Sequence, residues 1–538
     1  MDKLAHRLGL RTDPTIFFVS AAIMVFFVVA LVLMPSQIGD LFTAGRSWVV
    51  RNLGWFFIIG VNIWLGFLIW LAASRFGNIR LGGRDSLPEY GNLSWFAMLF
   101  AGGIGTVLMF WGVAEPISHF SEPPLPGVEA YSREAAQDAI SISIYHLGLH
   151  TWTIFTLPGL AFAYFIYRYR LPIRVSSVFY PLLKDGIYGP VGKVIDIFAV
   201  LGTLFGVAVS LGLGSAQIAA GLSALFGWED GVTMKVLILA ALTCVAVMSI
   251  VAGLDKGVKL LSNLNIGMAV ALMLFVLITG SSLFLLRGIV ETFGLYVSNL
   301  PRLAFWNDML ANLDPEGDGW GWQGSWTVFY WAWTVTWSPF IGLFVARISK
   351  GRTIREFVMG VLLAPSLFTL IWFSIFGWQA MEIDGIGEAA RAAMGDTAGQ
   401  LSAAVSDSVP LAMFAFFENF PFVHFVQGFG VLIVAIFFAT SSDSASLVID
   451  MLCTGEAEPG PVQQRVFWGA SEGLVAAMLI VLAGDTGITA LQEVITVIGL
   501  PIFILIFLMI PSIILGLRQE EIDHVTVGKR PTVESFGE

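Results

Sequence analysis

Long apolar runs recur along the whole chain and are separated by short polar stretches. Most runs hold about 20 residues, the length that an α-helix needs to cross the hydrocarbon core of a bilayer. The pattern predicts twelve such helices, near residues 15–36, 53–74, 91–116, 140–168, 194–226, 234–253, 261–286, 325–347, 354–381, 424–449, 465–484 and 490–517. We therefore expect an all-α integral membrane protein.

The composition supports the prediction of an integral membrane protein. Of the 538 residues, 57% are hydrophobic and 12% are charged, whereas soluble proteins carry about 25% charged residues. So little polar surface argues against a soluble globular enzyme, and the net charge of −11 argues against nucleic acid as a partner. Two cysteines, Cys244 and Cys453, are too few for a disulfide scaffold or a cysteine-rich metal site.

Basic residues are distributed unequally between the predicted loops. If both termini are cytoplasmic, 21 of the 28 Lys and Arg residues lie in inner segments, as the positive-inside rule requires. We therefore predict a multi-pass protein of the bacterial inner (cell) membrane with both termini in the cytoplasm. Residues 288–312 are predicted to form an external amphipathic helix, and residues 385–419 a second external helix with a short re-entry near Phe414.

Two predicted spans carry helix-breaking residues at matching places. The third span has glycine at positions 102, 103 and 105, and the eighth contains Pro339, which frees a backbone carbonyl in mid-span. Interrupted helices in corresponding halves of the chain are typical of the binding sites of secondary transporters. Taken alone, the glycine cluster is explained equally well by close helix packing.

The eighth span is also rich in indoles, with four tryptophans between residues 326 and 337. The run extends too far inward for an interfacial belt. Indole faces attract cations by about 2 kcal/mol when the pair is desolvated, and quaternary ammonium ligands are recognised in this way. Bulky core packing is the alternative interpretation of the same residues.

The tenth span places small oxygen-bearing side chains in mid-membrane, from Thr440 to Ser444. Hydroxyl and carbonyl oxygens at this depth suit a small hard cation such as Na⁺. The alternative is that these hydroxyls bond to their own helix. Asp443, within the same run, is a candidate because intramembrane carboxylates are usually functional.

The chain resembles the betaine/choline/carnitine transporter (BCCT) family along nearly its whole length. Residues 94–116, 253–265, 330–357 and 440–444 carry the likeness. The resemblance implies a LeuT-like fold, in which two peripheral helices precede two inverted five-helix repeats, and usually a homotrimer. The expected divisions are a short cytoplasmic N-terminus (1–14), two peripheral helices (15–90), the first repeat (91–286), an external amphipathic segment (287–324), the second repeat (325–517) and a short cytoplasmic tail (518–538).

The resemblance also implies a substrate site lined by the fourth and eighth helices. Its expected residues are Leu147, Trp152, Phe155, Trp331, Trp333, Thr334, Trp337, Gly103 and Gly105. Leu147 and Thr334 stand where the family usually has tryptophan, and Phe155 where it usually has tyrosine. Two interpretations follow from these departures.

In the interpretation we favour, the remaining aromatic surface binds a zwitterionic onium compound such as glycine betaine or dimethylsulfoniopropionate. In the other, a more polar solute such as a sulfonate or an amino-acid derivative is held by Thr151, Thr334 and Thr336. In either case membrane lipid and a small molecule are the expected partners, and no enzyme activity is expected.

Two Na⁺ sites of the family map onto this sequence. The first comprises Ala101, Ile104, Phe437, Thr440 and Ser441. The second comprises Thr203 and Phe340, but Val207 replaces a threonine there and an oxygen ligand is missing. We therefore predict Na⁺-coupled symport into the cell, with Na⁺ as the coupling ion rather than a prosthetic group. The brief tails predict uptake that needs no osmotic activation.

His146 and His150 are four residues apart, a spacing that can bind zinc. No third ligand lies between them, so we favour a structural or outer-gate role, and Glu115 is a further gate candidate. A membrane-embedded enzyme would need clustered catalytic groups, and a channel would need repeated polar pore faces. The sequence pattern favours neither.

Overall fold

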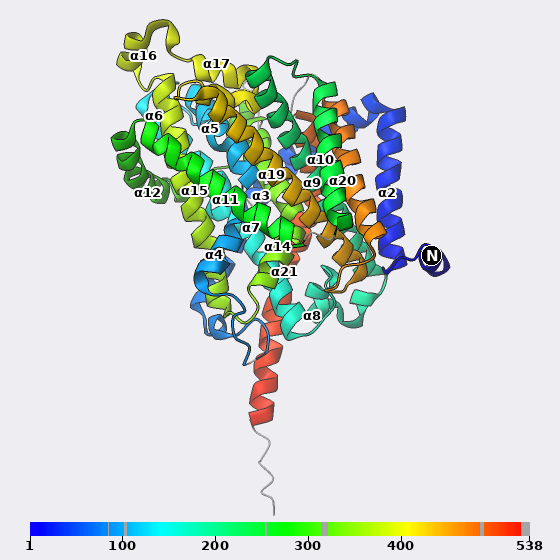
Figure 1. Ribbon diagram of the computed structural model, residues 1–538. Coiled ribbons are helices and arrows are strands. Elements are labelled where there is room, and N and C mark those ends of the chain that lie inside the picture. Colours follow the sequence, from blue (N-terminus) through cyan, green and yellow to red (C-terminus); the bar gives the residue numbers. More distant parts are fainter. Residues whose placement is uncertain (84, 102–104, 253–254, 314–320, 485–488, 529–538) are drawn as a thin grey trace, which may run out of the picture.

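The computed structural model describes residues 1–83, 85–101, 105–252, 255–313, 321–484 and 489–528. Within these residues the chain is helical, and its single isolated β-bridge pairs Arg80 with Thr353. Figure 1 shows that the long helices pack side by side in one bundle. The prediction of an all-α architecture is confirmed for this part of the chain.

The first half of the chain contains α1 (Asp2–Arg7), α2 (Pro14–Leu33), α3 (Pro35–Ala73), η1 (Arg75–Asn78), α4 (Asn92–Ala101), α5 (Gly105–Ser121), α6 (Arg133–Leu147), α7 (Leu149–Phe162), η2 (Ala163–Arg168), η3 (Ser176–Phe179), α8 (Tyr180–Leu183), η4 (Lys184–Tyr188), α9 (Pro190–Phe226), α10 (Val232–Ala252) and α11 (Asp255–Thr279). The second half contains α12 (Ser282–Phe305), η5 (Ala311–Leu313), α13 (Gly321–Ser325), α14 (Thr327–Ile348), α15 (Ile354–Asp384), α16 (Glu388–Met394), η6 (Gly395–Thr397), α17 (Gln400–Asp407), η7 (Val409–Leu411), α18 (Ala412–Phe417), α19 (Val423–Thr454), α20 (Val462–Ala483) and α21 (Thr489–Gly528).

Local sequence sets where several of these helices begin. Helix α2 starts at Pro14, whose missing N–H is not needed at the first helical position, and the Asp13 side chain accepts from the next backbone N–H groups. Helix α15 starts with a capping box, in which Thr353 and Glu356 each accept a hydrogen bond from the other's backbone N–H.

Eleven described helical segments are long and apolar enough to cross a membrane. All but one coincide with predicted spans, and the exception is α12, which we predicted to lie outside the membrane. Two predicted spans are not among the eleven. The third is described as the separate helices α4 and α5, and the described apolar stretch of α11, Asn263–Thr279, is shorter than the others.

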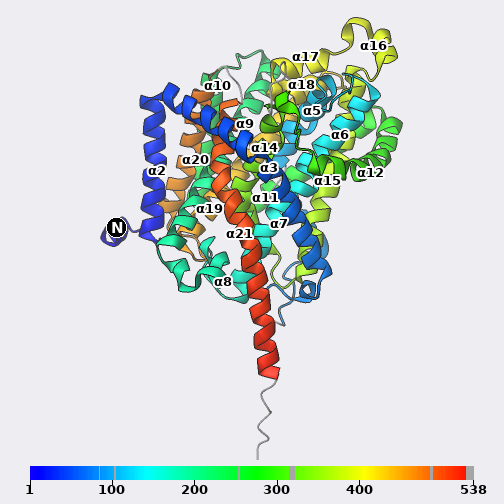
Figure 2. The same cartoon turned by 180° about the vertical axis from the view of Figure 1, so that it is seen from behind.

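Helices α3 and α21 run side by side, as Figure 2 shows from behind. A Cβ atom added to Gly60 would lie 2.6 Å from the ring of Phe503, so only glycine permits this close approach. The same ring lies 4.4 Å from that of Trp64, centroid to centroid. Aromatic packing therefore joins the N-terminal and C-terminal parts of the bundle.

The predicted fourth span is divided at Gly148, which separates α6 from α7. Gly148 is non-helical, with φ −100° and ψ −123°, and a Cβ there would lie 2.6 Å from the carbonyl oxygen of Ile144. We did not predict this break, because single glycines are usually tolerated inside apolar helices. It leaves Leu147 at the end of α6 and Trp152 in the first turn of α7.

The predicted interruption at Pro339 is not seen, because α14 continues through this residue. Pro339 offers no N–H to the carbonyl of Val335, but the hydroxyl of Ser338 donates to that carbonyl at 2.6 Å. The backbone irregularity lies earlier, at Trp326, which separates α13 from α14. The predicted break in the third span falls on residues 102–104, outside the described residues.

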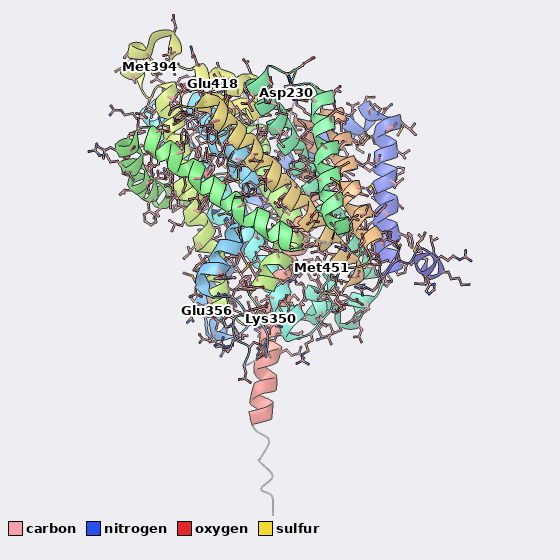
Figure 3. The ribbon with its side chains drawn as sticks, viewed as in Figure 1. Asp230, Lys350, Glu356, Met394, Glu418 and Met451 are labelled. Atoms are coloured by element: carbon pink, nitrogen blue, oxygen red, sulfur yellow. The ribbon has the colours of Figure 1, made fainter. Side chains whose placement is uncertain are left out.

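Figure 3 labels charged residues at both ends of the bundle. Lys350 and Glu356 lie at the end from which the last turns of α21 project, whereas Asp230 and Glu418 lie at the opposite end. The N-terminal segment contacts the loop between α19 and α20, since Arg11 donates to the backbone oxygen of Pro459 at 2.7 Å.

The segments predicted to be external differ in detail from expectation. Residues 385–419 form the short helices α16, α17 and α18 instead of one helix, because Gly387, Gly395 and Gly399 have positive φ values and break the segment. Figure 1 shows α16 and α17 at the end opposite to the tail of α21. Phe414 is buried, against Gly221 of α9.

Helix α12 packs one face on α6 and α15. The indole N–H of Trp378 in α15 donates to the hydroxyl of Thr292 at 2.8 Å. The other face exposes an apolar stripe that comprises Leu283, Leu286, Val290, Phe293 and Val297. The helix begins at Ser282 and ends at Phe305, whereas the predicted external segment covered residues 288–312.

Candidate functional site

Helices α7 and α14 pack closely against each other and carry most of the predicted substrate-binding residues. Trp152 is fully buried, and Phe155, Trp333, Thr334 and Trp337 are at most 7% exposed. The rings of Trp152 and Phe155 meet edge to face with centroids 5.5 Å apart, an arrangement that aromatic pairs prefer. The two helices predicted to line the site are therefore in direct contact, and their aromatic residues are closed to solvent.

Trp333 is held in one orientation by α9. Its indole N–H donates to the hydroxyl of Ser210 at 3.0 Å, and its ring stacks on Phe329 with centroids 5.5 Å apart. One turn later, Trp337 lies beside Gly206, where an added Cβ would be 3.0 Å from the indole. Because residues four apart lie on one side of a helix, Trp333 and Trp337 share the side of α14 that faces α9.

The structure does not bring Trp331 to that side of α14. Its ring stacks on His150 with centroids 5.9 Å apart and meets the ring of Tyr145 edge to face at 5.4 Å. Residues two apart are separated by about 200° around a helix, so Trp331 and Trp333 point in nearly opposite directions. Trp331 thus faces Tyr145 of α6 and His150 of α7 instead of α9.

The other predicted contacts are spread over several elements. Leu147 is buried at the end of α6, and Thr334 is buried within α14. Gly103 and Ile104 lie outside the described residues, and Ala101 ends α4 with its side chain likewise outside the description. Only Gly105, of the predicted glycine and cation positions on the third span, can be placed against its neighbours.

The start of α5 lies directly against α19 at the first predicted cation site. A Cβ on Gly105 would overlap the ring of Phe437, at 1.9 Å from its nearest atom. One turn along α19, the hydroxyl of Thr440 donates to the carbonyls of Ile436 at 2.9 Å and Phe437 at 3.1 Å. Its proton is thus used within the helix while its lone pairs remain available as ligands. Ser441 is partly buried beside it.

The second predicted cation site retains one unusual oxygen. Thr203 is fully buried, and its hydroxyl has no hydrogen-bond partner. Ser210 bonds to Trp333, and Gly206 lies against Trp337, so α9 and α14 run in opposite directions. Thr203 and Phe340 therefore each lie two turns beyond the pair Ser210 and Trp333. An orphan buried hydroxyl is a suitable cation ligand, but Val207, also buried, supplies no oxygen.

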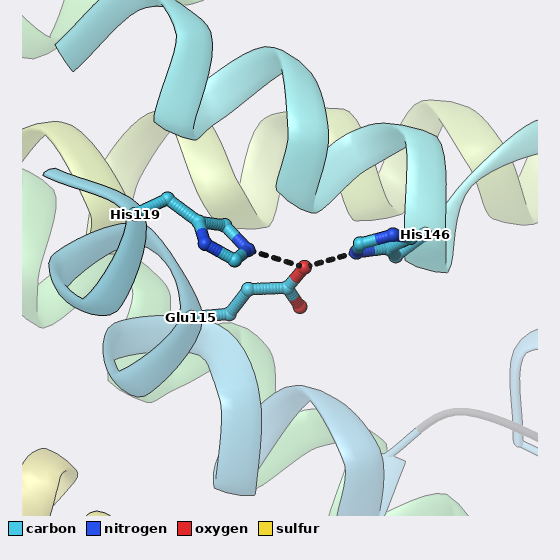
Figure 4. A group of neighbouring side chains, drawn as sticks. All are labelled: Glu115, His119 and His146. Atoms are coloured by element: carbon cyan, nitrogen blue, oxygen red, sulfur yellow. Dashed lines mark hydrogen bonds and ion pairs between the residues drawn. The ribbon is translucent and has the colours of Figure 1, made fainter. Parts of the chain in front are cut away.

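A buried polar network links α5, α6 and α14, and Figure 4 shows part of it. The carboxylate of Glu115 lies 2.6 Å from Nδ1 of His146 and accepts from the hydroxyl of Tyr330, also at 2.6 Å. Nε2 of His146 lies 2.9 Å from the hydroxyl of Thr327. His119 contributes a second imidazole, with Nε2 3.5 Å from the same oxygen of Glu115.

His146 and His150 therefore do not face one another across a common ligand. Nε2 of His150 instead lies 3.0 Å from the side-chain oxygen of Asn62 in α3. Our sequence analysis found no third ligand between the two histidines, but the fold brings Glu115 and His119 to His146. The spacing of Glu115 and His119, four residues apart on one helix, was the signal available in the sequence.

Glu472 in α20 is a second buried carboxylate, and the sequence analysis did not single it out. It is fully buried, and its two oxygens accept from the hydroxyls of Ser442 at 2.9 Å and Ser446 at 3.1 Å, both in α19. Ser442 follows directly on the predicted cation ligands Thr440 and Ser441, and Ser446 lies about one turn later. The available signal was a lone Glu within an apolar span, which usually marks a functional position.

Arg352 anchors α4 at the other end of the bundle. Its guanidinium lies 3.8 Å from the ring centroid of Trp95 and donates to the side-chain oxygen of Asn92 at 2.9 Å. Trp95 in turn donates to the hydroxyl of Ser349 at 2.9 Å. Burial lowers the pKa of Arg352, but an arginine so placed stays charged at physiological pH. The stacked guanidinium ties α4 to the turn between α14 and α15.

Comparison of the amino-acid sequence with known proteins shows which family it matches. The model of the betaine/carnitine/choline family transporter (BCCT) matches residues 15–522. The chain is 45% identical to an ectoine/glycine betaine/proline transporter of Corynebacterium glutamicum, over 96% of this chain and 82% of that protein. It is 40% identical to glycine betaine transporter 1 of Vibrio parahaemolyticus, over 95% of both chains. It is 37% identical to an osmo-dependent choline transporter of Acinetobacter baylyi, over 95% of this chain and 72% of that protein.

Proposed function

Because the chain belongs to the betaine/carnitine/choline transporter family, we propose that it takes up a zwitterionic onium compound together with Na⁺. Glycine betaine and dimethylsulfoniopropionate are the substrates we favour. Proteins of this family are transporters rather than enzymes, and relatives similar to this chain are named for glycine betaine, choline, proline and ectoine.

The contact between α7 and α14 carries the proposal. Trp152 of α7 and the pair Trp333 and Trp337 of α14 are buried in the interior of the bundle. A desolvated indole attracts an onium group by about 2 kcal/mol or more. Since Ser210 fixes the indole of Trp333 at 3.0 Å, this ring is preorganised, and little entropy is lost when a cation docks on it.

Coupling to Na⁺ is supported by the oxygens next to the aromatic helices. The hydroxyl of Thr440 keeps its lone pairs available one turn from Phe437, which lies against Gly105. The orphan hydroxyl of Thr203 is buried on the side of α9 that faces α14. Hard oxygen ligands suit Na⁺. We propose one complete Na⁺ site at Thr440 and Ser441 and a weaker one at Thr203.

The architecture we propose for this function has twelve membrane-spanning helices. Counting α4 with α5 as the third span, taking α11 as the seventh and placing α12 outside gives this number. Two inverted five-helix repeats, 91–286 and 325–517, would then follow two peripheral helices in a LeuT-like fold. The end of the bundle that carries Lys350 and Arg352 would face the cytoplasm of a bacterium, with both termini on that side.

A homotrimer is part of the same proposal. The exposed apolar stripe of α12, which includes Leu286, Val290 and Phe293, is wide enough to pack against a neighbouring subunit or lipid. Cross-linking in native membranes would distinguish a trimer from a monomer.

A second candidate substrate class is favoured by Thr334, which replaces an indole. Zwitterions without a quaternary ammonium group, including amino-acid derivatives and sulfonates, need donors rather than π surface. However, the hydroxyl protons of Thr151 and Thr336 are already donated to the carbonyls of His146 and Trp333. Two of the three proposed donors are thus engaged, and we rank this class second.

Uptake into proteoliposomes tests the proposal. Purified protein is reconstituted, and radiolabelled glycine betaine is supplied with an inward gradient of Na⁺, of K⁺ or of protons. We expect accumulation with the Na⁺ gradient alone, and competition by dimethylsulfoniopropionate. Accumulation of ectoine, proline or a sulfonate without glycine betaine would select the second class. Failure of every solute to accumulate would refute the proposed function.

A further inference from the structure

The carboxylate of Glu115 is fully buried within α5. Among the described residues, its ion-pair partners are His119 and His146, and neither Lys nor Arg is within pairing distance. An uncompensated charge at such a position costs several kcal/mol. The position therefore favours the binding of a positive charge beside this carboxylate.

The neighbouring groups match the ligands of a transition metal. One carboxylate oxygen faces two imidazole nitrogens, at 2.6 Å for His146 and 3.5 Å for His119 (Figure 4). The side chain of His119 is only 1% exposed, and its Nε2 has no hydrogen-bond partner. An orphan nitrogen aimed at a carboxylate is expensive in a purely structural network. Two histidines and one glutamate form a known zinc ligand set that leaves a fourth position open.

The distances are compatible with such an ion. The three ligand atoms lie within 4.8 Å of one another, and tetrahedral zinc ligands at 2.0–2.2 Å from the metal are about 3.4 Å apart. The separation of His119 from Glu115 already has this value. The imidazole of His146 would need to move away from the carboxylate by about 0.8 Å, which breaks one hydrogen bond and forms two metal bonds in its place.

We propose that Glu115, His119 and His146 form a binding site for a zinc-type divalent transition-metal ion. This inference goes beyond the proposed transport function. The hydroxyl of Tyr330, which lies 2.6 Å from the second oxygen of Glu115, would orient the carboxylate. The rings of Trp322 and Trp326 cover the site, with centroids 5.4 Å and 4.4 Å from that of His119.

A bound ion would join α5 to α6, since two ligands come from α5 and one from α6. Helix α5 is the outer part of the third predicted span, whose start lies against Phe437 at the candidate cation site. Cross-linking this helix to its neighbour restricts its movement, so zinc at saturating concentration is expected to slow any transport cycle that moves α5.

Metal binding to the purified full-length protein tests the proposal without reference to transport. The affinity tag is removed, and the protein is treated with a chelator and titrated with Zn²⁺ by calorimetry and with Co²⁺ by visible absorption. We expect one ion per chain and the ligand-field bands of tetrahedral Co²⁺. His119→Ala and His119→Gln should each raise the dissociation constant at least about tenfold, because even outer-shell changes cost 10–100-fold.

Two further measurements secure the result. His424→Ala removes an exposed histidine of α19 and should leave the affinity unchanged. Zn²⁺ should raise the melting temperature of the unaltered protein more than that of either His119 variant. Absence of binding to the unaltered protein, or an affinity in the two His119 variants equal to that of the unaltered protein, would overturn the proposal.

Discussion

Replacement of Trp333 by leucine should weaken the binding of an onium substrate selectively. Trp333 is 5% exposed, so a cation on its face is almost fully desolvated, and the attraction is then about 2 kcal/mol. A loss of this size corresponds to a roughly 30-fold rise in dissociation constant. Leucine keeps an apolar surface but lacks the π face, so the lost affinity reports the charge of the ligand.

The assay compares two ligands of the same shape. Glycine betaine carries a quaternary nitrogen, and tert-butylacetate is its carbon isostere without the positive charge. Calorimetry on the purified protein should show a roughly 30-fold loss for glycine betaine in Trp333→Leu. The change for tert-butylacetate should be much smaller, because only packing differs.

Two variants serve as controls. Ser210→Ala removes the acceptor 3.0 Å from the indole N–H and keeps the ring, so we expect about 1–3 kcal/mol lower stability and a smaller loss of glycine betaine affinity. Trp64→Leu removes another buried indole, which packs on Phe503, and should leave affinity unaltered. Equal losses for both ligands in Trp333→Leu would refute the cation–π argument.

Further predictions concern the cations, the substrate and a buried carboxylate. Thr440→Ala combined with Ser441→Ala should raise the Na⁺ concentration for half-maximal uptake at least tenfold, because two oxygen ligands are lost; unchanged Na⁺ dependence would show that the site is misplaced. Val207→Thr restores an oxygen near Thr203 and should lower that concentration, as Na⁺ titration of uptake would show. Thr334→Trp should shift the competition profile towards trimethylammonium compounds and away from proline. Glu472→Leu leaves the hydroxyl of Ser442 without its acceptor, whereas the hydroxyl of Ser446 keeps the carbonyl of Ser442. We expect a loss of about 1–3 kcal/mol in stability, measured by thermal unfolding, and a smaller loss for Glu472→Gln.

The sequence predicted the helices well and their irregularities poorly. Apolar length identifies a span because the bilayer imposes it, and ten of the twelve predicted spans coincide with candidate spans of the structure. Local breaks depend instead on the hydrogen bonds and backbone geometry of single helical turns. Pro339 does not interrupt α14, because the hydroxyl of Ser338 satisfies the carbonyl that proline leaves free. Gly148 does interrupt the fourth span, and its φ of −100° and ψ of −123° lie outside the helical range.

The sequence indicated candidate site residues but not how they are arranged in space. Helical periodicity already separates Trp331 from Trp333, yet the family resemblance grouped them, and only the neighbouring rings show that Trp331 faces His150. Ser210, which fixes Trp333, carries no signal in the sequence, since one serine in an apolar helix usually bonds to its own backbone. Long-range partners of this kind appear only in the folded chain.

A structure of the protein with glycine betaine and Na⁺ bound tests the central claim most directly. The account predicts the quaternary nitrogen between α7 and α14, within about 6 Å of the ring centroids of Trp152 and Trp333. A ligand bound beside Trp331 on the side of α6, or on the lipid-facing surface, would contradict it.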